Sequence, residues 1–142
     1  MRRFISLLVL AAGILSAADA LAPADLVQPA EAAKDVKTPL IIQVGFDVLY
    51  RSSHIPGSLY AGPASKPEGI ADLKKAVAGQ PKDRQIVLYC GCCPWDKCPN
   101  IRPAVAALKA MGYSRVRAVM LPENLKTDWI DKGYPIEKRA GQ

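Results

Sequence analysis

Residues 85–103, QIVLYCGCCPWDKCPNIRP, decide how the rest of the chain is interpreted. The stretch begins with a short run of mainly apolar and β-branched residues, which is typical of a buried strand. All four cysteines of the chain follow within nine positions, from Cys90 to Cys98. An alanine-rich segment at 104–111 comes next, and Pro103 suits a first helical turn. A strand, a thiol-rich loop and a helix in succession indicate a reactive or metal-binding sulfur site.

Segments with strand and helix patterns alternate on both sides of this stretch. Such alternation favours an α/β fold, in which helices cover both faces of a parallel sheet. Ligand sites of these sheets lie at the carboxyl ends of the strands, where Cys90 is expected. Asn100 is a good N-cap candidate for the following helix. We expect strands at 40–45, 55–60, 85–89 and 116–120, one or two helical turns in 46–53, and helices at 70–77, 100–111 and 125–132.

The first residues have the pattern of a secretory signal peptide. Arg2 and Arg3 precede an apolar run at 4–15, and residues 18–20, ADA, form a small-x-small cleavage site. The apolar run is shorter than the ~20 residues that span a bilayer, which disfavours a membrane anchor. We therefore predict export, to the bacterial periplasm, with no stable membrane insertion after cleavage. The expected division is a signal peptide at 1–20, a flexible mature N-terminus at 21–38 with a short helix in 29–34, one domain at 39–138 and a tail at 139–142.

The charge pattern gives little support to nucleic-acid binding. The formal net charge is +6 at pH 7, but the lysines and arginines are scattered and form no dense basic block. Scattered positive charges are typical of a solvated surface, and they exert at most a mild attraction on small anions. We therefore expect no nucleic-acid partner.

Two motifs connect the chain to a known family. Residues 53–58, SHIPGS, and the strand 86–90, IVLYC, resemble segments of a single-domain rhodanese, a member of the sulfurtransferase family. The resemblance extends over residues 40–136, which is most of the mature chain. It implies a three-layer domain with a central parallel sheet of about five strands. It also implies sulfur transfer through a persulfide on Cys90, and a structural rather than catalytic role for His54.

The chain departs from the family pattern at several positions. Residues 43–45 are QVG, where the family has Asp-Val-Arg. The acidic and the basic residue of that pattern are therefore missing from this chain. Eleven residues separate Cys90 from Arg102, where the family has about four. The enlarged loop also carries three additional cysteines. These departures leave the fold inference intact and weaken the inference about substrate.

The chemistry of persulfide transfer assigns roles to residues in the loop. The nucleophile must be a thiolate, and Cys90 is the first candidate because it ends the strand. Cys98, near the helix start, is the second candidate or a resolving thiol. Arg102, with Lys97, is expected to bind a small anionic sulfur donor such as thiosulfate, and a thiophilic acceptor completes the reaction. A protein thiol is a further candidate partner. The predicted substrate-binding set also includes Gly91, Cys92, Cys93 and Trp95.

Other interpretations of the cysteine loop remain open at this point. Cys93 and Cys98 are placed to form a loop disulfide, and the thiol pairs also suit a thiol–disulfide redox protein. Four soft ligands, Cys90, Cys92, Cys93 and Cys98, suit Cu(I) or Zn(II), although their spacing matches no standard zinc pattern. The leading expectation includes no resident metal or cofactor. A catalytically silent rhodanese fold that binds a soft metal or a protein partner is the last alternative.

Overall fold

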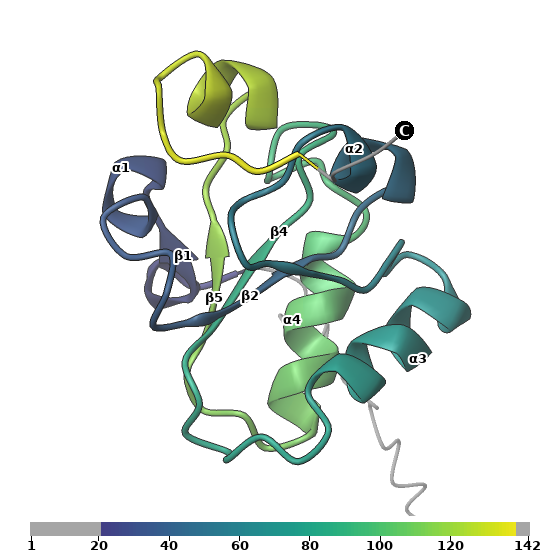
Figure 1. The fold of residues 1–142 in the computed structure, drawn as a ribbon. Helices are drawn as coiled ribbons and strands as arrows, with labels where there is room; N and C mark the ends of the chain where they lie inside the picture. Colours follow the sequence, from purple (N-terminus) through teal and green to yellow (C-terminus); the bar gives the residue numbers. More distant parts are fainter. Residues whose placement is uncertain (1–20, 139–142) are drawn as a thin grey trace, which may run out of the picture.

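A computed structural model describes residues 21–138, and the expected signal peptide and C-terminal tail lie outside the described residues. The chain forms a three-layer α/β domain, with helices on both faces of one parallel sheet (Figure 1). This architecture agrees with the expectation from the sequence. Within residues 21–138, no helix is both long and apolar enough to cross a membrane.

The sheet has five strands in the order β1-β5-β4-β2-β3, and every neighbouring pair is parallel. β4 lies in the centre, and its four residues are all buried. When both faces of a parallel sheet are covered, its strands have nearly continuous apolar sequences, which explains why β4 is so apolar. The strands are β1 (Leu26–Val27), β2 (Leu40–Gln43), β3 (Leu59–Tyr60), β4 (Ile86–Tyr89) and β5 (Val116–Val119).

Two apolar clusters hold the layers together, one on each face of the sheet. α3 (Pro67–Ala76) and α4 (Ile101–Ala110) bury their apolar sides against the first face. α1 (Pro29–Ala32) and a π-helical turn at Lys126–Ile130 cover the second face, where Trp129 is completely buried. The remaining helices are a 3₁₀ turn at Pro23–Asp25 and α2 (Asp47–Ser52), which follows β2.

The segment 21–38 differs from its expected flexible state. Leu26 pairs with Ala118 and Val27 pairs with Val119, so β1 is an edge strand of the sheet. Ion pairs hold the segment on either side of β1, from Lys109 Nζ to Asp25 at 2.6 Å and from Arg117 to Glu31 at 3.1 Å. A strand of two residues is too short to produce a recognisable alternating pattern, and its order depends on its pairing with β5. The domain therefore begins before residue 39.

Three other elements have bounds that differ from the expectation. The strand within 55–60 is confined to Leu59–Tyr60, and α3 begins at Pro67 rather than at residue 70. The segment 125–132 forms a π-helical turn at Lys126–Ile130. Boundaries of this kind depend on local hydrogen bonds that a hydrophobic pattern does not encode.

The alternation of side chains along β4 determines where the cysteine loop starts. Ile86 and Leu88 face α3 and α4, whereas Val87 and Tyr89 face the opposite cluster. Successive residues of a strand point to opposite faces, so Cys90 continues on the side of α3 and α4. Its side chain is accordingly part of the same buried cluster as Ile86 and Leu88. The first cysteine thus enters the core beside the start of α4.

Candidate functional site

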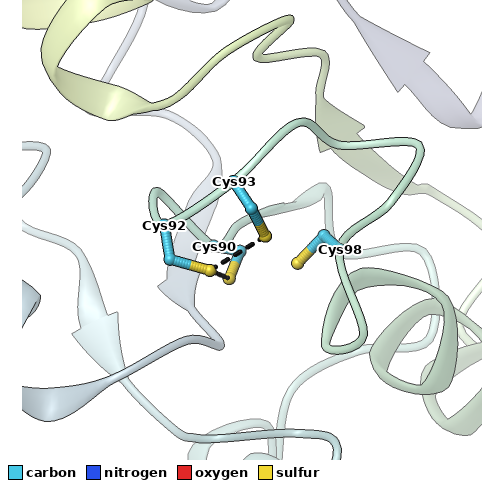
Figure 2. A group of neighbouring side chains, drawn as sticks. All are labelled: Cys90, Cys92, Cys93 and Cys98. Carbon is cyan, nitrogen blue, oxygen red and sulfur yellow. Dashed lines mark hydrogen bonds between the residues drawn. The ribbon is translucent and has the colours of Figure 1, made fainter.

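The four cysteines meet in one cluster at the carboxyl end of β4, in a segment that we call the thiol loop (residues 90–98). Their four Sγ atoms all lie within 4.8 Å of one another (Figure 2). Cys92 Sγ lies 3.2 Å from Cys90 Sγ and 3.0 Å from Cys93 Sγ. Cys90 and Cys98 are buried, with 3% and 1% of their surface exposed, whereas Cys92 and Cys93 are partly exposed. All four are free thiols in this structure.

Backbone contacts anchor the enlarged thiol loop to the rest of the domain. Gly91 adopts a positive φ of 86°, and its carbonyl accepts a hydrogen bond from Leu125 N–H at 3.1 Å. A Cβ at Gly91 would lie only 3.2 Å from the Cβ of Leu125, so both the conformation and the packing require glycine. Further along, Trp95 N–H donates to the Leu121 carbonyl at 3.0 Å. The loop is therefore held against the segment that follows β5.

Gly45 makes room for the first cysteine, a role that the sequence analysis did not assign to it. A Cβ at this position would lie 2.6 Å from the Cys90 carbonyl oxygen and 2.8 Å from its sulfur. Contacts this short force the backbone to move. The glycine also allows the end of β2 to approach the thiol cluster closely.

Two buried amide side chains position Cys90 from either side. Asn100 Nδ2 lies 3.4 Å from Cys90 Sγ, and its Oδ1 accepts a hydrogen bond from Ser65 N–H at 2.9 Å. On the other side, Gln43 Nε2 donates to the Cys90 carbonyl at 3.1 Å. Asn100 does occupy the N-cap position of α4, but its side chain makes no capping hydrogen bond. The expected cap instead connects the cluster to the loop before α3.

The electrostatics of the cluster favour negative charge on Cys98. The Sγ atoms of Cys90 and Cys98 lie within 4.8 Å of each other, and Cys98 is close to the backbone N–H groups of Asn100 and Ile101 at the start of α4. The neighbouring Cys90 thiol, with these N–H groups, outweighs the effect of burial and lowers the pKa of Cys98 to about 6. Its interaction with Cys98, together with burial, raises the pKa of Cys90. Burial, followed by contact with Cys92, raises the pKa of Cys93 to about 12.

The basic and aromatic residues of the predicted site lie along the outside of the loop. Arg102 Nη1 donates to the Asp96 carbonyl at 2.8 Å, so the guanidinium braces the turn between the loop and α4. Lys97 and Asp96 are exposed, and Trp95 is partly exposed. The roles proposed for Arg102, Lys97 and Trp95 in binding an anionic donor stay predictions.

A second group of polar contacts, the His54 corner (residues 53–58 with Glu137), follows α2 along the chain. His54 Nδ1 is 2.8 Å from the Tyr50 carbonyl, and the two rings stack with centroids 4.1 Å apart. Backbone hydrogen bonds in both directions pair His54 with Glu137. Beneath the corner, the Tyr89 hydroxyl accepts from Ile55 N–H at 3.1 Å. These contacts agree with the structural role expected for His54.

Comparison with known proteins gives the same family as the sequence motifs. A family model described as a rhodanese-like domain matches residues 23–120. A Bacillus halodurans protein of known structure is 18% identical, with a TM-score of 0.62, over 81% of this chain and 77% of its own. The rhodanese-like domain of an Anabaena protein is 20% identical, with a TM-score of 0.57, over 83% and 86%. At these identities the structures establish a shared fold. No curated protein matches the chain.

Proposed function

The chain belongs to the rhodanese-like domain family, and we propose that it transfers sulfane sulfur through a persulfide on Cys90, with Cys98 as the thiolate partner. The observation that carries the proposal is the buried Cys90–Cys98 pair at the N-terminus of α4. Cys90 occupies the position at which the family forms its persulfide. Cys98 supplies the negative charge that an isolated buried thiol would lack.

The first half of the reaction uses both thiols of the pair. Cys90 attacks the outer sulfur of thiosulfate while its proton passes to the Cys98 thiolate. A sulfur–sulfur bond forms at Cys90, the sulfur–sulfur bond of thiosulfate breaks, and sulfite leaves with the bonding electrons. The backbone N–H groups that face Cys98 then lie beside the new persulfide anion, where positive potential from the helix start stabilises it.

The second half of the reaction returns the thiols to their starting state. A thiophilic acceptor attacks the outer sulfur of the persulfide, which regenerates the Cys90 sulfur without any external oxidant or reductant. The enlarged loop and the scattered positive charge are compatible with a small anionic donor. The expected export to the bacterial periplasm remains part of the proposal, because it decides which donors the protein meets.

Intact mass measurement tests the proposal directly. The purified protein should gain the mass of one sulfur atom on incubation with thiosulfate, and cyanide should remove that sulfur as thiocyanate. The Cys90→Ser variant should gain none, whereas Cys98→Ser should gain it more slowly. If thiosulfate leaves no adduct on the wild type, or if Cys90→Ser still accepts the sulfur, the assignment of Cys90 is wrong.

A second candidate function, soft-metal binding, follows from the mutual distances of the thiols. Four Sγ atoms within 4.8 Å of one another could converge on a single Cu(I) or Zn(II) ion. Such an ion would hold the sulfurs by replacing their protons. Native mass spectrometry after addition of Zn(II) or Cu(I), with Cys90→Ser and Cys93→Ser for comparison, tests this function. Retention of one ion by the wild type, with loss in both variants, would support it.

A further inference from the structure

The proposed persulfide is formed on a sulfur that solvent hardly reaches. Only 3% of the Cys90 surface is exposed, because Gly45 packs closely beside it and α4 lies beside it in the core. An acceptor larger than thiosulfate or cyanide must still approach the persulfide closely, with its thiol in line with the sulfur–sulfur bond. Release of sulfur from Cys90 to such an acceptor therefore needs another route out of the core.

An open cavity adjoins the thiol loop on the side of Cys92. Its volume is about 520 Å³, which lies in the range of small-molecule sites. Gly91 and Cys92 form the part of its wall that belongs to the loop, and the residues following β5 form the opposite part. The cavity lining also includes Leu49, Leu125, Ile130, Ser52, Ser53 and Asn124.

Cys92 therefore touches both the buried thiol and the open cavity. Its Sγ lies 3.2 Å from Cys90 Sγ (Figure 2). Cys92 is also partly exposed and lines the cavity. The outer sulfur of a persulfide extends only about 2 Å beyond the sulfur that carries it, so Cys92 stays within reach of it. Building on the proposed function, we propose that Cys92 is the exit thiol: it takes the sulfur from Cys90 and delivers it to a small thiol bound in the cavity.

The relay balances without any additional reactant. The Cys92 thiolate attacks the outer sulfur of the Cys90 persulfide; a new sulfur–sulfur bond forms at Cys92 and the bond at Cys90 breaks. Cys90 leaves as a thiolate and takes up the proton that Cys92 released. The acceptor thiolate then attacks the outer sulfur on Cys92, becomes a persulfide, and leaves Cys92 as a thiolate.

The lining of the cavity indicates which acceptor it takes. Leu49, Leu125 and Ile130 offer an apolar surface, and the serines at its rim offer hydroxyl groups. Lys126 is the cation of this cavity, but its ammonium is bound at 2.9 Å to both carboxylate oxygens of Asp131. A cavity whose walls are largely apolar, and whose lysine is exposed and already paired with Asp131, favours an uncharged thiol with an apolar body over a small anionic thiol.

A rapid-quench experiment with thiosulfate as donor and benzyl mercaptan as acceptor tests the relay. After quenching with an alkylating reagent, tandem mass spectrometry should locate the added sulfur first on Cys90 and then on Cys92. The Cys92→Ser variant should still load sulfur onto Cys90, and each loaded molecule should release it to benzyl mercaptan at least about tenfold more slowly than the wild type does. Ser52→Trp, a change at the exposed rim, should raise the KM for benzyl mercaptan without slowing the loading.

The possible outcomes separate the relay from the function on which it rests. If the wild type never loads sulfur, the sulfurtransferase proposal fails. If Cys92→Ser loads sulfur and releases it to benzyl mercaptan at the wild-type rate, the relay is wrong while the sulfurtransferase proposal stands. If Cys93→Ser blocks release and Cys92→Ser does not, the exit thiol is wrongly assigned. A preference for mercaptoacetate over benzyl mercaptan would overturn the assigned class of acceptor.

Discussion

The His54 corner and the thiol loop show opposite relations between family resemblance and chemistry. The corner carries the motif that most resembles the family outside the thiol loop, yet its histidine is held by Tyr50, through ring stacking and a hydrogen bond, and by backbone pairing with Glu137. The thiol loop departs most from the family pattern, yet it gathers four thiols within 4.8 Å. A motif that resembles a family strongly can thus maintain the fold, while the divergent loop determines the chemistry on it.

The contrast has a physical basis in what each region requires. The hydroxyl groups of Tyr89 and Ser58 are buried and hydrogen-bonded to each other. An unpaired buried hydroxyl would destabilise the fold, so few other residues are tolerated at these two positions. The thiol loop needs only its anchors, such as Gly91, and can vary between them. Changes in the corner should therefore lower stability and leave the activity of the folded protein unchanged. Changes around the loop should mainly lower activity.

The largest expected effect comes from Gly45→Ala. The new Cβ would lie 2.6 Å from the Cys90 carbonyl oxygen, so the nucleophile must move, and a displacement of about 1 Å can lower the rate about 100-fold. Thiosulfate-dependent thiocyanate formation measures this loss. Gly57→Ala is the matched control in the corner, where a Cβ meets nothing within 4 Å but φ is 71°. It should lower stability by about 1 kcal/mol and leave activity unchanged.

The pH dependence of sulfur loading tests the thiolate assignment in the loop. The reactive pair needs Cys98 ionised, and its pKa is lowered to about 6, so the loading rate should rise with pH from about 5 to 7 and then level off. In Cys98→Ser, Cys90 must ionise by itself. The rise should then move to above about pH 8, with a loss of about 10- to 100-fold at pH 7. An unchanged profile in this variant would contradict the pairing.

Tyr89→Phe tests the corner through its buried hydroxyl. The change leaves Ile55 N–H without its acceptor and Ser58 Oγ without its partner, which should destabilise the fold by about 1–3 kcal/mol. Thermal unfolding should show a lower Tm by about 4 °C per kcal/mol. Activity per folded molecule should stay at the wild-type value. Tyr134→Phe, at a partly exposed tyrosine, provides a control that should change Tm little.

Glu137→Gln should have the smallest effect of the four. The carboxylate lies 3.7 Å from His54 Nε2 and accepts from Gly57 N–H at 3.2 Å, but 55% of the side chain is exposed. Exposed pairs contribute less than about 1 kcal/mol, and the amide oxygen of glutamine can still accept the backbone hydrogen bond. Chemical denaturation should detect a change near the limit of measurement. A loss of activity at unchanged stability would show that the corner does take part in the chemistry.

Sequence patterns predicted the elements whose apolar residues follow a local pattern, such as a continuous run or a helical period. β4 and α4 could be predicted because a continuous apolar run and a helical period are visible within ten residues or so. β1 was not predicted, because two residues carry no period and their order comes from β5. Long-range contacts also explain the role of Asn100. Its position before α4 predicts a helix cap, whereas its amide connects Cys90 with Ser65.

The sequence by itself determined that a thiol-rich loop follows a buried strand and precedes a helix. Those relations are local, so adjacent residues are enough to establish them. Only the tertiary structure decided which sulfurs are buried, that the pKa of Cys98 is lowered, and that Gly45 makes room for Cys90. Burial, pKa and close packing depend on atoms contributed by segments far apart in the chain, and no pattern within one segment contains them.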